Sequence, residues 1–300
     1  MFTVLGATGT VGGQLAASLL GDGHRVRAVG RSASRLDTLA RLGAEPAVAD
    51  ATDVPALTDA MRGSSAVFVM QPADATAVDH MASQRSMTDA IVGALRDSGV
   101  SRVVVLSSVG AEIPSGTGFL AGLHVMEQGL ASLPDVDMLT LRAGWFYDNA
   151  RAYLPLIQHA GLVADSLDPD VAVPMVATRD IAAAAREALT GESWGGGHPI
   201  REILGPVDLD QATVTRVLGR ALGLPEMEYV RLSDDDMIAT LVAEAGFSPD
   251  VARHHVGMTR AINDGRVAAR HTGVPVITGP TTIDDYAATL AEALLSPDKR

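Results

Sequence analysis

The sequence predicts an α/β protein built on a doubly wound parallel sheet, followed by a smaller and mostly helical C-terminal cap. Short apolar segments alternate with segments of helical periodicity through the first half of the chain, which implies βαβ units with right-handed crossovers. A glycine-rich turn joins the first of these strands to the first helix. Aromatic residues make up only 4% of the 300 residues, while the abundant Ala, Val and Leu suit strands that are buried on both faces.

The strands of the first half are expected at short apolar runs, and the helices where apolar residues recur every three or four positions. The expected strands cover residues 2–6, 25–30, 45–50, 66–70, 102–108 and 137–142. The expected helices lie near residues 11–21, 33–42, 55–62, 77–98 and 119–132. Strands and helices of this length alternate as they do in an open parallel sheet.

The second half is less regular. Helices are expected over 146–160 and 180–190, the latter with Asp180 as its N-cap, and a strand over 200–205 after a loop at 193–199. Further helical patterns lie near 210–222, 233–245, 249–265 and 283–295, with a short strand at 228–232. We therefore expect a nucleotide-binding domain of residues 1–150 and 171–205, and a substrate-binding cap of residues 151–170 and 206–300.

Composition excludes several classes of function. The net charge of −13 argues against nucleic-acid binding, which needs a positive surface. The chain has no cysteine, so it has no thiol chemistry and no disulfide. The histidines at 254, 255 and 271 do not form a metal-ligand pattern with any carboxylate, and we assign no metal. No apolar run approaches the ~20 residues of a membrane span, and we expect a cytoplasmic protein.

The glycine turn at the end of the first strand predicts a dinucleotide site. Three evenly spaced glycines allow a tight strand-to-helix turn and a close approach of the backbone to a diphosphate. The first N–H groups of the following helix then point at that diphosphate. The residues assigned to this site are Gly6, Thr8, Gly9, Thr10, Val11 and Gly12. The alternative is a purely structural turn.

The loop after the second strand predicts NADP(H) rather than NAD(H). An NAD enzyme usually places an acidic residue there for the ribose 2′-hydroxyl, whereas this chain has Arg31 after Gly30. A guanidinium grips a 2′-phosphate through charge-assisted hydrogen bonds. Ser32 and Arg35 add donors in the same loop. The alternative is that both arginines belong to an ordinary solvated helix start.

Two other strand ends are expected to contact the cofactor. Asp50 ends the third strand, where the adenine would lie, and is expected to accept a hydrogen bond from its amine. Met70 and Gln71 end the fourth strand, near the ribose and the diphosphate. Asp53 is expected to cap the helix that contains Pro55.

Several motifs together resemble one family. They are "VLGATGTVGG", "RAVGRS", "VVVLSSVGA", "HVMEQGLAS", "LRAGWFYDN", "VPMVATRDIAAAAREAL" and "ILGP". The chain resembles the NmrA-like atypical short-chain dehydrogenases, and over residues 1 to about 222 it is similar to the NADPH-dependent quinone oxidoreductases of that group. The resemblance implies a Rossmann-like fold, NADP(H) binding and a substrate cleft between sheet and cap. Relatives of this kind include reductases, natural-product enzymes and NADP-binding regulators of transcription.

The usual catalytic pair of short-chain dehydrogenases, Tyr-x-x-x-Lys, is absent, because the only lysine is Lys299. A proton must then come from another group or from water. Ser107 and Ser108 end the fifth strand, at the edge where such sheets bind ligands. His124 lies on the next helix, where relatives often carry His or Lys, but it precedes Glu127 by three residues instead of four. A structural role for this histidine is the alternative.

The segment after the sixth strand is expected to wall the substrate cleft. Trp145 and Phe146 can stack on a flat substrate, with core packing beneath the cap as the alternative. Asn149 can bind the nicotinamide amide or the chain itself. The catalytic candidates are His124, Ser108 and Tyr147, and Ser107 and Asn149 are assigned to the cofactor.

Three functions are compatible with these residues. The first is NADPH-dependent reduction of a quinone or a flat aromatic ketone, because a quinone needs little acid assistance. The second is the tailoring of an aromatic polyketide, by ketone reduction or NADPH-supported oxygenation, since arginine in place of lysine indicates a high-GC genome. The third is an NADP sensor that docks on a protein partner. A homodimer is compatible with the sequence and is not required by it.

Overall fold

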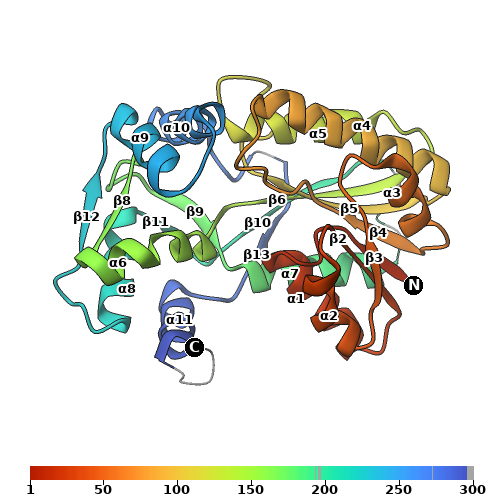
Figure 1. Ribbon diagram of the computed structural model, residues 1–300, viewed down its shortest axis with the longest axis horizontal. Helices are drawn as coiled ribbons and strands as arrows, with labels where there is room; N and C mark the ends of the chain where they lie inside the picture. Colours follow the sequence, from red (N-terminus) through yellow and green to blue (C-terminus); the bar gives the residue numbers. More distant parts are fainter. Residues whose placement is uncertain (193, 195–196, 272, 296–300) are drawn as a thin grey trace.

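In the computed structural model, an eight-stranded sheet forms the body of the molecule and a second group of elements packs at its carboxyl edge (Figure 1). The structure describes residues 1–192, 194, 197–271 and 273–295. The sheet strands are β1 (Phe2–Val4), β2 (Val26–Gly30), β3 (Glu45–Val48), β4 (Ala66–Val69), β5 (Arg102–Ser108), β6 (Asp137–Ala143), β10 (Ile200–Leu204) and β13 (Val276–Thr278).

The strand order is β13-β10-β6-β5-β4-β1-β2-β3, and every neighbouring pair is parallel. The chain runs outward from β1 through β2 to β3, then returns to β4 on the other side of β1. The order therefore reverses between β1 and β4. In open α/β sheets a ligand binds at the carboxyl ends of the strands at such a switch point.

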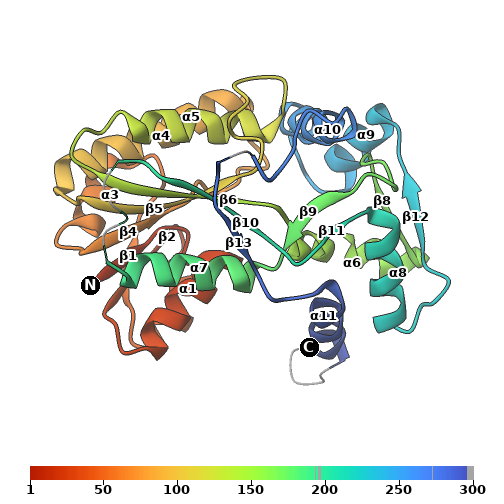
Figure 2. The same cartoon turned by 180° about the vertical axis from the view of Figure 1, so that it is seen from behind.

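Helices cover both faces of the sheet. Helices α3 (Val54–Met61), α4 (His80–Ser98) and α5 (Phe119–Ala131) lie on one face, and α1 (Thr10–Gly21), α2 (Ala33–Arg41) and α7 (Thr178–Thr190) lie on the other (Figures 1 and 2). Successive residues of a strand alternate between the two cores. On β4, for example, Phe68 is buried on the α1 and α7 side, whereas Val67 and Val69 are buried on the α4 and α5 side.

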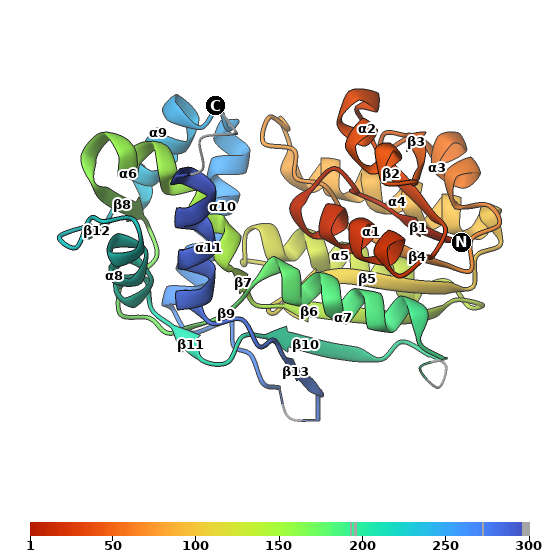
Figure 3. The ribbon, with the colours of Figure 1, turned by 90° about the horizontal axis from the view of Figure 1, so that it is seen from below.

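The cap is a mixed structure with its own core. Its elements are β7 (Trp145–Phe146), η1 (Tyr147–Tyr153), α6 (Leu154–Ala160), β8 (Leu162–Asp165), β9 (Val173–Val176), β11 (Asp208–Leu209), α8 (Gln211–Ala221), β12 (Glu228–Arg231), α9 (Asp234–Glu244), α10 (Pro249–Asn263) and α11 (Ile283–Leu295). Strands β7, β9 and β11 form one small sheet, and β8 and β12 form another. From below, α6, α8 and α11 lie together beyond the carboxyl edge of the main sheet (Figure 3).

The predicted α/β fold class is confirmed, and all six strands expected in the first half are present. The structure corrects details of the second half. Asp180 is not an N-cap, because α7 begins two residues earlier and Ala177 is its N-cap residue. The Asp180 carboxylate instead accepts hydrogen bonds from the N–H and hydroxyl of Thr281 (3.0 and 2.8 Å).

The single helix expected over 146–160 is also wrong, since β7, a 3₁₀ segment and α6 occupy this region. Pro155 accounts for the break: its ring cannot continue a preceding α-helix, but it fits the first turn of α6. Strand β13 lies within the 206–300 range expected for the cap, yet it pairs with β10 in the main sheet. The expected loop at 193–199 falls partly outside the described residues. Within the described part of the chain, no helix combines the length and apolar character needed to cross a membrane.

Candidate cofactor and substrate site

The glycine turn places helix α1 against the end of β1. Gly6 has a φ of +64°, a left-handed conformation that favours glycine. The Gly9 N–H donates to the Gly6 carbonyl oxygen at 2.9 Å, which closes the turn. A Cβ on Gly12 would lie 2.8 Å from the Gly6 carbonyl carbon and closer still to its oxygen. Only a residue without a side chain therefore allows α1 to lie this close to the strand.

The start of α1 has the geometry of an anion site. Its N-cap residue is Gly9, and no side chain among the described residues caps the helix. The first N–H groups of a helix have no partner within the helix, and here they belong to Thr10, Val11 and Gly12. These N–H groups lie at the positive end of the helix dipole, and this end of the helix is at the carboxyl edge of the sheet. These residues fit the diphosphate of a dinucleotide.

The loop after β2 packs against the glycine turn. The Arg35 guanidinium donates to the Thr8 carbonyl oxygen at 2.8 Å. The Ser32 hydroxyl caps α2 by accepting from the Arg35 N–H at 3.4 Å. Arg31 follows the last residue of β2 and is exposed. The structure thus anchors the Arg35 guanidinium on the turn and leaves Arg31 exposed at the end of the neighbouring strand.

Asp50 lies at the same carboxyl edge of the sheet, but its carboxylate already accepts hydrogen bonds from the protein. It accepts from the Thr52 hydroxyl at 2.6 Å and from the Thr52 N–H at 2.9 Å. These hydrogen bonds, and to a smaller extent the charge of Arg31, hold the pKa of Asp50 below its ordinary value. Its predicted bond to adenine stays a prediction. Asp53, in contrast, caps α3 through the Ala56 N–H as expected.

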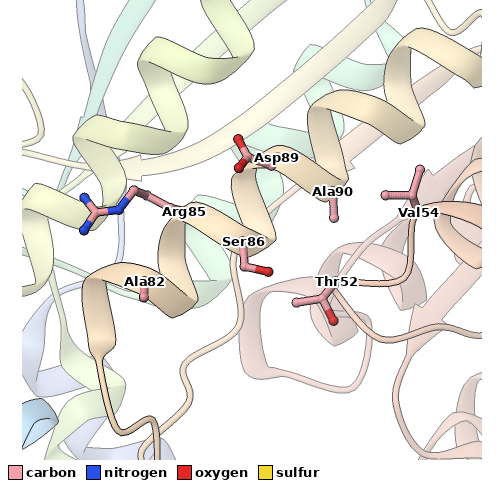
Figure 4. Close-up of a pocket in the computed structure, with 7 residues that line it drawn as sticks. All are labelled: Thr52, Val54, Ala82, Arg85, Ser86, Asp89 and Ala90. Atoms are coloured by element: carbon pink, nitrogen blue, oxygen red, sulfur yellow. The ribbon is translucent and has the colours of Figure 1, made fainter.

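A cavity of about 570 Å³ lies beside Thr52. Thr52 and Val54 line it from the start of α3, and five residues line it from α4 (Figure 4): Ala82, Arg85, Ser86, Asp89 and Ala90. The cavity opens next to the position predicted for the adenine. It has room for the planar base of a dinucleotide.

The end of β4 contributes Met70 and Gln71. The Met70 side chain fills the space in front of Gly6, where a Cβ would lie 2.6 Å from its sulfur. Gln71 donates its amide N–H groups to the Gln84 carbonyl at 3.0 Å and the Thr88 hydroxyl at 2.7 Å. The Gln71 Oε1 is buried and accepts no hydrogen bond within the described part of the chain. An acceptor left without a donor suits a ligand hydroxyl.

The end of β5 carries a buried ionic network that the sequence did not reveal. The Ser107 hydroxyl donates to Glu127 at 2.5 Å, and Arg142 binds both oxygens of that carboxylate at 3.0 and 2.6 Å. Ser107, Glu127 and Arg142 are 3%, 6% and 7% exposed. The Ser107 hydroxyl is therefore committed to the protein. Its predicted contact with the cofactor stays a prediction and is not supported by this placement.

The network continues toward β13. Arg142 also pairs with Glu112 at 3.1 Å, and Glu112 lies 3.3 Å from His271 Nε2. His271 Nδ1 lies 2.6 Å from Glu202, which is fully buried. The sequence gives only a weak signal for this network, because the charged residues are scattered over residues 112 to 271. Within the described residues no group of three His, Asp or Glu is arranged to hold a metal ion.

Two of the catalytic candidates lie at the carboxyl edge. The Ser108 hydroxyl donates to the carbonyl oxygens of Val109 and Ala143 at 3.0 and 3.3 Å. His124 is half-buried on α5, and its Nδ1 lies 2.9 Å from the Ala111 carbonyl oxygen. A carbonyl can only accept, so Nδ1 carries a hydrogen and Nε2 is the nitrogen that exchanges a proton.

Tyr147 lies in the core of the cap instead. It is 2% exposed, its ring is 5.8 Å from that of Tyr286, and its hydroxyl has no hydrogen-bond partner among the described residues. Burial raises the pKa of Tyr147 to about 12, with a smaller contribution from the charge of Asp180. A catalytic role for Tyr147 stays a prediction that this position does not favour.

The other residues after β6 are more accessible. Trp145 and Phe146 are partly buried; Trp145 packs against the cap core and Phe146 against the core of the sheet. Asn149 is exposed. This arrangement agrees with core packing for much of each aromatic ring and leaves part of each ring available to a ligand.

Comparison with known proteins identifies the chain. A family model described as NAD(P)H-binding matches residues 6–191, which include the glycine turn, the loop after β2 and the carboxyl ends of β4 to β6. The chain belongs to the NAD(P)H-binding family. The expectation that it is an oxidoreductase that uses this cofactor is confirmed.

Two relatives illustrate the similarity. A (4-alkanoyl-5-oxo-2,5-dihydrofuran-3-yl)methyl phosphate reductase from Streptomyces griseus is 30% identical over 297 residues, 98% of this chain and 99% of the relative. The crystal structure of an NADPH-dependent quinone oxidoreductase from Escherichia coli, complexed with NADPH, superposes with a TM-score of 0.76 at 22% identity. It covers 97% of this chain and 99% of that chain. This second likeness shows a shared fold.

Proposed function

We propose that this protein reduces a quinone or a flat aromatic ketone with NADPH. The observation that carries the proposal is the uncapped, glycine-bounded start of α1 with the exposed guanidinium of Arg31 beside it. The helix start fits a diphosphate, and Arg31 fits a 2′-phosphate. When bound, NADPH supplies a hydride.

The protein's own part is to orient the acceptor and to manage one proton. Glu127 is anchored to Ser107 at the carboxyl end of β5. His124 lies three residues before Glu127 on α5, so it is about 4.5 Å closer to the start of the helix. In this proposal the ring acts as an imidazolium, and its Nε2–H gives a proton to the oxygen that becomes negative during reduction. The exposed parts of Trp145 and Phe146 provide apolar surface for a flat ring.

The test is the oxidation of NADPH in the presence of a naphthoquinone and of an aromatic ketone. We expect acceptor-dependent oxidation and products heavier by two hydrogens. A His124→Gln variant should lose at least tenfold in kcat with the ketone and much less with the quinone, because the quinone needs little acid. His159→Gln, which changes an exposed histidine on α6, is the matched control. Binding of NADPH without turnover of any acceptor would favour an NADP sensor, and a product that gains oxygen would favour an oxygenating polyketide enzyme.

A second candidate substrate is a conjugated lactone that carries a phosphate ester. It is favoured by the Streptomyces griseus reductase, whose similarity covers nearly the whole of both chains. A conjugated lactone resembles a quinone in presenting an electron-poor carbon to the hydride. Comparing kcat/KM for such a lactone and for the naphthoquinone distinguishes the two substrate classes.

A further inference from the structure

A second cavity, of about 660 Å³, lies where the body and the cap meet, and it shares only Arg85 with the cavity of Figure 4. Its walls come from the start of α4, from residues 114–118 before α5, and from α10 with the residues that follow it. We call it the junction groove. Ligand sites often lie between two structural units, because both units can supply contacts.

The two walls of the groove are held close together. Gly118 has a φ of +56°, and a Cβ there would overlap the His254 carbonyl oxygen of α10. On the far side, the Ser248 N–H and hydroxyl donate to the Ala75 and Ala77 carbonyl oxygens at 2.8 and 2.6 Å. The groove is therefore a fixed feature of the body–cap contact.

Positive charge dominates the lining. Four arginines face the groove, against two carboxylates, although the whole chain carries a net charge of −13. The arginines are Arg85, Arg253, Arg260 and Arg266, and the carboxylates are Asp250 and Asp264. A concave surface with an excess of one sign of charge concentrates ligands of the opposite sign.

The charges of Arg85 and Arg266 are not neutralised by direct ion pairs. Arg85 is exposed and has no hydrogen-bond or ion-pair partner among the described residues. The Arg266 guanidinium donates to the Gly116 and Ser115 carbonyl oxygens at 3.0 and 3.2 Å, which fixes its position without cancelling its charge. A guanidinium that is held in place but not neutralised retains N–H donors for an oxyanion.

Asp250 and Arg260 are occupied by groups other than a ligand. One Asp250 oxygen accepts from the His80 N–H at 2.8 Å, and the other lies 3.4 Å from Arg253. Arg260 pairs with Asp234 outside the groove. Among the described residues Arg253 has only this long contact, and it is well exposed, so it can turn to a ligand at small cost.

A buried nitrogen beside the groove also lacks a partner. His80 is 6% exposed, and its Nε2 makes no hydrogen bond within the described residues. Its ring lies 4.7 Å from that of His254, which lines the groove. A polar atom buried without a partner is unusual in a folded protein, and a bound ligand or water at this junction would satisfy it.

We propose that the junction groove binds a dianionic oxyanion of the phosphate-ester class, held mainly by Arg85, Arg253 and Arg266. Planar guanidinium groups match the paired oxygens of a phosphate. The volume of the groove leaves room for an organic portion attached to the phosphate. This site goes beyond the proposed reduction and does not depend on it.

The experiment is calorimetric titration of the NADPH-saturated protein at low salt, with inorganic phosphate and with glycerol 3-phosphate as probes. Saturation with NADPH keeps the probes off the start of α1. We expect both probes to bind with saturation. If the groove serves an organic phosphate ester, glycerol 3-phosphate should have the lower Kd. If it serves the free ion, the Kd of inorganic phosphate should be equal or lower. The Kd should rise about tenfold in Arg85→Gln and in Arg253→Gln, because each loses one charge-assisted contact.

Arg96→Gln is the matched control, since Arg96 is exposed on the last turn of the same helix as Arg85 and lies outside the groove. It should leave the Kd within twofold of the original protein. Because Arg85 also borders the cavity of Figure 4, Arg253→Gln separates the groove from the cofactor site. Absence of saturable binding up to about 10 mM probe, or equal affinity in all three variants, would overturn the proposal.

Discussion

The Gly12→Ala substitution tests how closely α1 must approach β1. The new methyl group would lie 2.8 Å from the Gly6 carbonyl carbon and closer to its oxygen. Both atoms belong to the backbone, and the Gly6 oxygen already accepts from the Gly9 N–H. Relief of this overlap requires the whole first turn of α1 to move away from the strand.

The size of the effect follows from overpacking. An extra methyl group in a tightly packed site costs about 1–3 kcal/mol, and we expect a fall of this size in the free energy of unfolding. The displaced turn carries the N–H groups assigned to the diphosphate. If the shift weakens binding by a similar free energy, the Kd for NADPH rises about tenfold to a hundredfold, since each tenfold change corresponds to about 1.4 kcal/mol.

The assay combines urea unfolding with a fluorescence titration of NADPH. Gly21→Ala is the matched control, because Gly21 ends the same helix and a Cβ there meets nothing within 4 Å. This control should keep the affinity for NADPH and gain up to about 1 kcal/mol in stability from the better helix propensity. A Gly12→Ala protein with unchanged affinity and stability would refute the reasoning.

Three further predictions concern buried polar groups. Glu127→Gln should lower the free energy of unfolding by about 3 kcal/mol in urea denaturation, because it leaves the buried Arg142 without its closest carboxylate; an unchanged midpoint would contradict this. Burial, aided by the charge of His254, lowers the pKa of His80 from 6.5 to about 4, so the unfolded chain takes up the proton first and stability falls as the pH drops below about 6.5. Between pH 7 and pH 5 this contribution of His80 amounts to about 2 kcal/mol. The total loss of stability over that range should therefore be smaller by about 2 kcal/mol in His80→Leu than in the original protein. Tyr147→Phe should keep kcat within twofold, because the hydroxyl lies in the cap core; a loss of tenfold or more with intact NADPH binding would restore Tyr147 as a catalytic residue.

The sequence predicts the body of the fold well because the signals there are local. Each of the first six strands is an apolar run beside a turn, and the glycine spacing describes a backbone shape that needs no distant partner. Strand β13 was missed for the opposite reason. It has three residues, of which Val276 is 41% exposed, and only its pairing with β10 makes it a strand.

The polar network at the end of β5 was missed for a related reason. Glu127 lies within a helical pattern and Arg142 ends a strand pattern, so each can be interpreted from the sequence as a solvated charge. Their burial follows from the packing of α5 on β5 and β6, which brings the two side chains to 2.6 Å. The role of Asp180 was mispredicted for the same reason. Its carboxylate accepts a hydrogen bond from Thr281, about a hundred residues away in the sequence.

The central claim is that the start of α1 and Arg31 together recognise the diphosphate and the 2′-phosphate of NADPH. The most direct test is the ratio of the Kd values for NADH and NADPH, measured by titration in the original protein and in Arg31→Gln. We predict that NADPH binds at least tenfold tighter than NADH, and that the substitution removes most of this preference while leaving the affinity for NADH nearly unchanged. Equal affinities for the two nucleotides in the original protein, or a preference that survives the loss of Arg31, would contradict the account.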